Sequence, residues 1–171
     1  VTGGEVEIAD FPHAHLEVPL IFLRESGAGV FRGDDALVVR GGRCYPVDLA
    51  TGPYPGINSD MQPLFAVYGA AARGESRLID LRFPGRYAYA DELARHGLQH
   101  HTDGNVLRSD GGAPLTGAKV RALDLRAGVA LCLAVLMADG ETVWRNAWQV
   151  ERGYSNFAPK LHGLGGRIDV R

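Results

Sequence analysis

Residues 74–97 read GESRLIDLRFPGRYAYADELARHG, and the same plan occurs twice more in the chain. The stretch opens with Gly-Glu, continues as a strand-like run and closes with a short helical pattern that ends in Leu-x-x-x-Gly. Equivalent stretches start at Gly4 and Gly140 and close at residues 23–27 and 161–165. Glycine is suited to the closing position because it adopts the left-handed conformation that ends many helices. The chain is therefore built from a repeated unit.

The segments around these stretches complete the unit. Probable turns at residues 34–35 and 103–105 predict hairpins in the first two copies, and the third copy is expected to form one strand over 142–150. Apolar helices are predicted over 61–72 and 127–138, with no counterpart before Gly4. The order helix, strand, helix, hairpin, strand predicts an α/β fold in which sibling units pack together. We expect units at about 1–50, 51–120 and 121–171, forming one partial domain truncated at its N-terminus.

Composition limits the classes of protein that the chain can represent. Of its 171 residues, 46% are apolar and 22% are charged, which predicts one globular domain with a substantial core. A formal net charge of −2 gives no bulk attraction to nucleic acid or to anionic membranes. Because no apolar run is long enough for a membrane span and no secretory pattern opens the sequence, we expect a cytoplasmic protein.

Charged residues recur where the chain is expected to enter a helix: Asp60, Arg86, Arg126 and Arg152. A helix N-terminus disfavours cations through its dipole and offers free N–H groups to anions. Arginines at such positions make most sense when an anion binds beside them. Since stacked repeats present equivalent loops on one face, the four residues are expected to share a phosphate or carboxylate site.

Structural alternatives exist for each of these residues. Asp60 or Ser59 could be a helix N-cap, and capping alone would explain an Asn-Ser-Asp cluster before a helix. The arginines could each pair with a surface carboxylate, and such pairs contribute little. The carboxylates considered for that role are Asp91, Asp124 and Glu151.

Other candidate sites are weaker. His13, His15 and Glu17, and separately the pair at residues 100–101, offer metal-ligand chemistry without a third ligand at a recognisable spacing. Cys44 and Cys132 show no metal-ligand spacing and are expected to be buried thiols. No phosphate loop, nucleophile elbow or dinucleotide glycine pattern is present. We therefore expect no metal and no cofactor.

Four motifs resemble those of the UDP-N-acetylglucosamine enolpyruvyl transferases, which belong to the EPSP synthase superfamily. Residues 54–63 (YPGINSDMQP) resemble the proline-glycine and threonine-aspartate-methionine-glutamine segment of that family. Residues 83–87 (FPGRY) are similar to its Phe-Glu-Asn-Arg-Phe segment, and residues 122–127 (ALDLRA) to its Thr-Asp-Leu-Arg-Ala motif. Residues 151–154 (ERGY) resemble its Asp-Arg-Gly-Tyr motif. The resemblance covers essentially the whole chain.

The resemblance implies a fold and a reaction. The family has two domains, each an inside-out α/β barrel of three units, with the active site in the cleft between them. It moves the enolpyruvyl group of phosphoenolpyruvate to the 3'-hydroxyl of UDP-N-acetylglucosamine through a tetrahedral intermediate and releases phosphate, in the first committed step of peptidoglycan precursor synthesis. This chain would supply the C-terminal side of the cleft, and the N-terminal domain, in cis or in trans, the other. The isolated chain is not expected to turn over.

The resemblance also implies roles for individual residues. Asp60 corresponds to the aspartate at the acceptor hydroxyl and is the candidate general base. Arg126 and Arg152 correspond to the arginines that hold phosphoenolpyruvate and stabilise its intermediate. Arg86 and the adjoining pair Asp124 and Leu125 correspond to supporting, substrate-binding positions in the cleft.

Departures from the family pattern leave the acceptor open. Arg82 stands where the family has an apolar residue that lines the nucleotide, and Gln149 replaces a histidine before Arg152. An additional guanidinium at the nucleotide end could favour another phosphorylated acceptor, such as UMP in nucleoside-antibiotic biosynthesis. A third reading is a non-catalytic fragment or subunit that keeps the fold.

Overall fold

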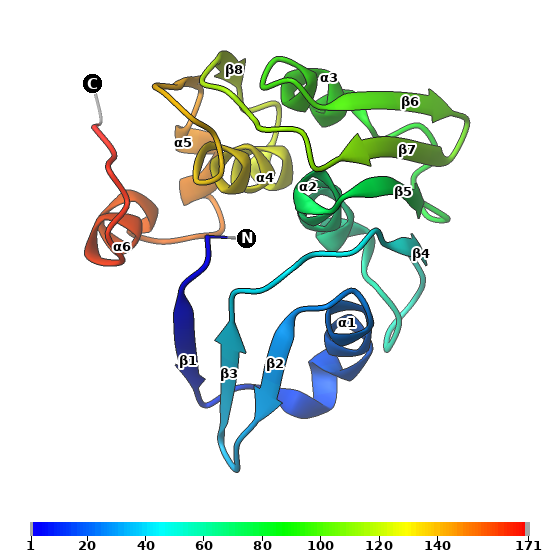
Figure 1. The fold of residues 1–171 in the computed structure, drawn as a ribbon, viewed down its shortest axis with the longest axis vertical. Coiled ribbons are helices and arrows are strands. Elements are labelled where there is room, and N and C mark those ends of the chain that lie inside the picture. The colour runs from blue at the N-terminus through cyan, green and yellow to red at the C-terminus, as the bar shows by residue number, and fades with distance from the viewer. Residues whose placement is uncertain (1, 170–171) are drawn as a thin grey trace.

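The strands form three separate sheets in a computed structural model that describes residues 2–169 (Figure 1). The first sheet has the order β1-β3-β2, with bounds Glu5–Ala9, Ala36–Arg40 and Gly29–Arg32. The second has the order β4-β5-β7-β6, with bounds Asp48–Ala50, Gly74–Ile79, Val106–Gly111 and Gln99–Asp103. The third pairs β8 (Lys119–Arg121) with β9 (Val143–Arg145).

The sheets repeat one topology. In the first two sheets the strand that follows Gly-Glu pairs antiparallel with the second strand of the hairpin, so β1-β3-β2 corresponds to β5-β7-β6. Strands β4 and β5 are parallel and are joined across helix α2 (Gln62–Ala71), as β8 and β9 are joined across α4 (Leu125–Val135). This crossover and hairpin arrangement confirms the predicted α/β class.

The remaining helices follow the strands after Gly-Glu. They are α1 (His13–Glu25), α3 (Ala88–Ala94), the single turn α5 (Trp148–Glu151) and α6 (Phe157–Gly163), and a 3-10 turn, η1 (Ser59–Met61), leads into α2. The glycines predicted to end three of these helices, Gly27, Gly97 and Gly165, have φ of 91°, 107° and 93°. Their left-handed backbone confirms the predicted helix ends.

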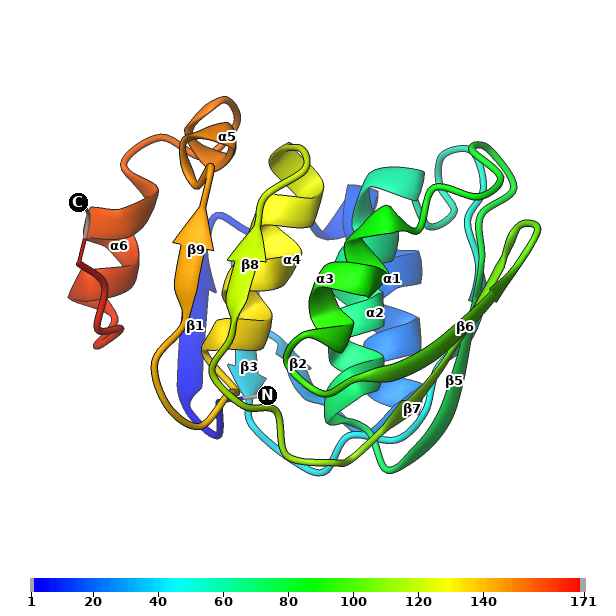
Figure 2. The ribbon, with the colours of Figure 1, turned by 90° about the horizontal axis from the view of Figure 1, so that it is seen from above.

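The core lies where α2 and α4 pack together. Figure 2 shows α2, α3 and α4 side by side, with strands β5, β6 and β7 on one side and β8 and β9 on the other. Both central helices bury alanines four residues apart, Ala66 and Ala70 on α2 and Ala130 and Ala134 on α4. Residues with this spacing share a helix face, and their small side chains permit close packing. This packing holds the N-termini of α2 and α4 beside each other.

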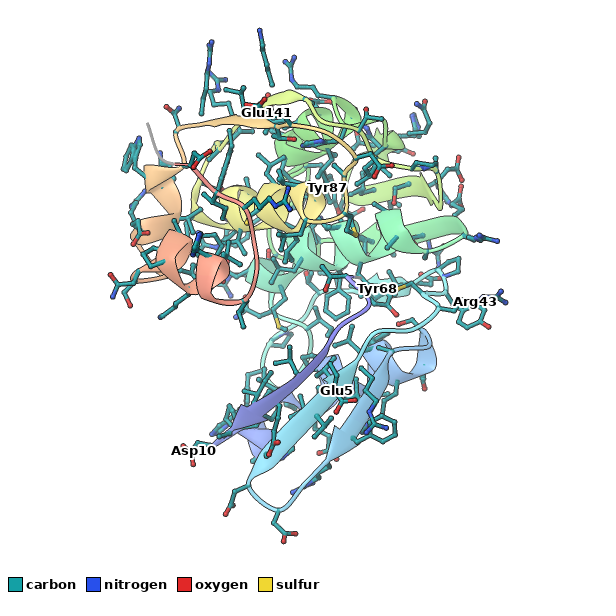
Figure 3. All side chains as sticks on the ribbon, turned by 60° about the vertical axis from the view of Figure 1, so that its left-hand side comes forward. Glu5, Asp10, Arg43, Tyr68, Tyr87 and Glu141 are labelled. Atoms are coloured by element: carbon teal, nitrogen blue, oxygen red, sulfur yellow. The ribbon has the colours of Figure 1, made fainter. Side chains whose placement is uncertain are left out.

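The first unit joins this core through α1. In Figure 1 strands β1 to β3 and α1 form the lower part of the molecule. Val18, Phe22 and Leu23 of α1 pack against the main core. Tyr68 of α2 lies at the same boundary (Figure 3), where its hydroxyl donates a hydrogen bond to the carbonyl of Ser26 at 2.7 Å.

Two expectations are wrong. The strand predicted over 142–150 is only three residues long, because Asn146 adopts φ of 57° and turns the chain into α5. Cys132 is buried as expected, but Cys44 is half-exposed in the irregular segment before β4. Within residues 2–169, no helix has the length and apolar character that crossing a membrane requires.

Candidate active site

Three of the four residues at helix entries converge. Asp60 lies in η1, Arg86 in the loop before α3, and Arg126 in the first turn of α4. Arg126 donates from Nη2 to Asp60 Oδ2 at 2.8 Å, and its Nε also contacts the Asp60 carboxylate. Arg86 lies 3.6 Å from Asp60 and 3.6 Å from Asp124. Together with Asp124, these three side chains therefore form a network in which acidic and basic groups alternate.

Capping does not explain Asp60. The side chain that caps η1 belongs to Asn58, which accepts a hydrogen bond from the backbone N–H of Asp60 at 2.9 Å. Asp124 caps α4 by accepting from the N–H groups of Arg126 and Ala127, both at 2.8 Å. The Asp60 carboxylate is therefore directed to the arginines, while Asp124 caps a helix and pairs with Arg86.

Of the three carboxylates considered as ion-pair partners for these arginines, only Asp124 has that role, in its pair with Arg86. Asp91 lies 3.3 Å from His100, and Glu151 accepts hydrogen bonds from the backbone N–H groups of Asn156 and Phe157, each at 3.1 Å. Neither carboxylate pairs with Arg86, Arg126 or Arg152.

Ion pairing sets the charge state of the site. The hydrogen bond from Arg126, reinforced by the charges of Arg126 and Arg86, outweighs burial and holds the pKa of Asp60 below its ordinary value of 3.8. The same hydrogen bond raises the pKa of Arg126. The exposed fraction is 46% for the Asp60 side chain and 31% for that of Arg86, so a ligand can reach both side chains.

Arg82 lies beside this network. The Phe83 ring carries the guanidinium of Arg82 at 5.4 Å from its centroid and that of Arg86 at 5.1 Å. Such contacts hold a guanidinium in place while leaving its N–H groups available. Across residues 2–169, no carboxylate lies within 4.0 Å of Arg82, so its charge is not neutralised by an ion pair.

Arg152 lies near the network but does not join it. Its Nη1 donates to Gln149 Oε1 at 3.1 Å. The following Gly153 packs against Leu125, since a Cβ at Gly153 would lie 2.9 Å from Leu125 Cδ2. Leu125 thus packs beside the segment that carries Arg152, next to the N-terminus of α4.

The structure also reveals residues that the sequence analysis did not single out. Phe83 supports two guanidinium groups, and Asp80 lies buried behind the loop that carries them. The available signal was an acidic residue at the end of a strand, in SRLID.

The histidines considered as metal ligands have other partners. His13 contacts the carbonyl of Ala36 and His15 contacts the hydroxyl of Tyr54, both at 3.1 Å. In the described part of the chain, no three His, Cys, Asp or Glu side chains are grouped to hold a metal ion.

The two aspartates predict how stability depends on pH. Burial would raise the pKa of Asp80, but hydrogen bonds from Ser59, Phe83, Arg82 and Thr51 outweigh it and lower that pKa, as ion pairs do for Asp60. Because both pKa values lie below 3.8 in the folded state, the unfolded chain binds more protons near that pH. We expect the free energy of unfolding to be steady at neutral pH and to fall as pH decreases through 3.8 towards the folded pKa values.

Urea unfolding at pH 7, 5, 4 and 3 measures this dependence. Asp80→Asn should weaken it, whereas Asp110→Asn, a change at an exposed position, should leave it unchanged. Equal pH dependence in wild type and Asp80→Asn would contradict the assignment.

Comparison with known proteins places the chain in a family. The sequence model of the family "EPSP synthase (3-phosphoshikimate 1-carboxyvinyltransferase)" matches residues 1–161. The chain is 37% identical over 171 residues to a UDP-N-acetylglucosamine 1-carboxyvinyltransferase of Xanthobacter autotrophicus, covering 99% of this chain and 40% of that one. It is 40% identical to a protein of the same name from Desulfofundulus thermocisternus, covering 98% of this chain and 69% of that one.

Solved structures agree with the sequence relationship. The enolpyruvyl transferase NikO from Streptomyces tendae matches 98% of this chain and 41% of its own, with a TM-score of 0.89 and 30% identity. An EPSP synthase from Acinetobacter baumannii, with a TM-score of 0.72 over 98% of this chain and 40% of its own, is 16% identical and shares the fold. The chain spans about 40% of the length of the Xanthobacter relative. It belongs to the EPSP synthase family of carboxyvinyltransferases.

Proposed function

We propose that the protein transfers the enolpyruvyl group of phosphoenolpyruvate to the 3'-hydroxyl of UDP-N-acetylglucosamine and releases phosphate, as a cytoplasmic step of peptidoglycan precursor synthesis. The observation that carries the proposal is the paired Asp60 and Arg126, held beside Arg86 in a chain similar to enzymes named for this activity. A carboxylate and guanidinium groups are the chemistry that a hydroxyl nucleophile and an anionic co-substrate require.

The arginines supply anion binding. Phosphoenolpyruvate carries a phosphate and a carboxylate, and a guanidinium can bind either group with two parallel hydrogen bonds. The side chains of Arg126 and Arg86 are partly exposed, at 36% and 31%, and both contact Asp60. Arg152 lies on the segment that packs against Leu125, next to Arg126. Leu125 and Asp124 place Arg126 at the start of α4. In this proposal the arginines stabilise the charge that develops when the acceptor oxygen adds to C2 and a proton from solvent adds to C3.

Asp60 supplies the base. Its lowered pKa makes it a weak base while both arginines hold it. When the anion of phosphoenolpyruvate takes over hydrogen bonds from Arg126 and Arg86, the interactions that lower this pKa weaken. The carboxylate can then accept the proton of the acceptor hydroxyl as the C–O bond forms. Loss of phosphate from C2 and release of a proton from C3 to solvent then give the enolpyruvyl ether. Substrate binding itself activates the base in this scheme, because it draws the arginines away from Asp60.

The charged network needs a second domain to enclose it. The exposed side chains of Asp60 and Asp124 leave the network open on one side, and the Xanthobacter relative is about two and a half times as long as the region it shares with this chain. We propose that a second domain, in cis or in trans, closes over the network and completes the active site. Closure would strengthen each charge interaction by excluding water.

Arg82 favours a second candidate acceptor. It is a cation without a carboxylate partner among the described residues, held on Phe83 next to Arg86. Such a group suits a terminal phosphate, so a nucleoside monophosphate such as UMP is the alternative acceptor.

Isothermal titration with UDP-N-acetylglucosamine and with UMP separates these acceptors. The primary proposal predicts preference for the sugar nucleotide and about 10-fold or greater weakening in Asp60→Ala, because a charge-assisted hydrogen bond is lost. The alternative predicts preference for UMP and a similar loss in Arg82→Val. Arg121→Val, which removes an exposed arginine from β8, should bind as wild type does. Equal binding by wild type and Asp60→Ala would contradict the primary proposal.

A further inference from the structure

Asp80 is a buried carboxylate that directly follows β5. Its exposed fraction is 0%, which makes it one of the most enclosed charged side chains in the described part of the molecule. Its hydrogen-bond donors are hydroxyl and backbone N–H groups rather than cations. A buried charge is costly unless it is well hydrogen-bonded, so this arrangement calls for an explanation.

The carboxylate joins two loops. Oδ1 accepts from Thr51 Oγ1 at 3.0 Å, and Oδ2 accepts from Ser59 Oγ at 2.6 Å. Oδ1 also accepts from the backbone N–H groups of Arg82 at 2.9 Å and Phe83 at 3.0 Å. Residues 51–59 follow β4 and residues 80–86 follow β5, which is parallel to it. Both loops therefore leave the sheet at the same edge, where parallel sheets commonly bind ligands.

Each loop carries part of the charged network. Ser59 immediately precedes Asp60, and its hydroxyl is anchored on Asp80. The anchored backbone of Phe83 supports the ring on which the guanidinium groups of Arg82 and Arg86 lie. One carboxylate thus fixes the loop with the acidic group relative to the loop with the basic groups.

Further hydrogen bonds hold the backbone of Asp80 in place. Its backbone N–H donates to Tyr87 Oη at 2.9 Å, and this hydroxyl donates to the carbonyl of Asn105 at 2.6 Å. Tyr87 is 4% exposed and lies within the main body of the molecule (Figure 3). The turn between β6 and β7 is thereby connected to the end of β5, which limits movement of the carboxylate.

We propose that Asp80 is a positioning residue that holds Asp60 and the Arg82–Arg86 pair in one arrangement by accepting hydrogen bonds from both loops. Its importance for catalysis rests on the proposed function, whereas the positioning of Asp60 does not. The competing explanation is that Asp80 contributes only to global stability. The two differ in what happens to Asp60 in a protein that remains folded.

Carboxyl carbon NMR of Asp60 in wild type and Asp80→Asn tests the proposal. Asparagine keeps the size and one acceptor oxygen but loses the second acceptor. Loosening of the two loops should weaken the contacts of Asp60 with Arg126 and Arg86, so its pKa should rise towards 3.8. A lower unfolding temperature with an unchanged Asp60 pKa would mean that Asp80 acts on stability alone, and would overturn the proposal.

Ser59 provides a matched pair of variants if Asp80→Asn does not fold. Ser59→Ala removes the hydroxyl that contacts Asp80 and should raise the Asp60 pKa, whereas Ser59→Thr keeps a hydroxyl and should preserve it. Equal Asp60 pKa values in these two variants would overturn the proposal. Titration with phosphoenolpyruvate of wild type completed by the second domain tests the proposed function separately. Asp60 pKa values that differ between the variants, together with no binding by the completed protein, would support the positioning role and count against the enzyme activity.

Discussion

Arg126→Ala should lower the rate of enolpyruvyl transfer by about 100- to 1,000-fold, the effect typical of losing one preorganised donor to a charged transition state. Arg126 makes the shortest contacts to Asp60 and is the leading cause of its lowered pKa. Its removal takes away a group that holds phosphoenolpyruvate and also releases the base from its partner. A chimera in which this chain replaces the aligned region of the Xanthobacter autotrophicus relative allows phosphate release to be measured.

Two variants control for charge and for folding. Arg126→Lys keeps the charge but cannot make the forked contact, so its rate should lie between those of wild type and Arg126→Ala. Arg121→Ala, at an exposed position five residues earlier, should retain wild-type activity. An Arg126→Ala chimera as active as the parent would exclude Arg126 from the reaction.

Leu131→Ala should destabilise the chain by about 2–5 kcal/mol, the range for large-to-small changes in a packed core. Leu131 of α4 is 0% exposed and belongs to the main core that α2 and α4 share. The loss combines transfer free energy with the cavity left behind. Because domains are stable by only about 5–15 kcal/mol, such a change should clearly shift the urea midpoint.

Leu164 provides the matched control, since the same substitution there removes a side chain that is 75% exposed. Leu164→Ala should change the free energy of unfolding by less than about 0.5 kcal/mol. Similar urea midpoints for the two variants would contradict the assignment of α4 to the core.

The repeat and its helix ends could be predicted from sequence because they depend on local chemistry. Glycines at 27, 97 and 165 end helices through their own backbone freedom, and Gly-Glu starts recur at the strands. The strand over 142–150 could not be predicted correctly. Its apolar and aromatic residues favour a strand, but the left-handed turn at Asn146 overrides that preference.

The candidate site could be predicted in part. Asp60, Arg86 and Arg126 were identified by their recurrence at helix entries, which topology places at one end of the core. Asp80 was not identified, because its one signal, an acidic residue at the end of a strand, does not distinguish it from other aspartates. Its importance arises from contacts with residues 21 to 29 positions away. Phe83 was missed as a support because a single aromatic residue does not indicate which cations lie on it.

The measurement that tests the central claim most directly is phosphate release by the chimera from phosphoenolpyruvate, with and without UDP-N-acetylglucosamine, alongside its Asp60→Asn variant. Our account predicts turnover that requires the sugar nucleotide and is strongly reduced by Asp60→Asn. A folded chimera that releases no phosphate, or one whose activity survives Asp60→Asn unchanged, would contradict it.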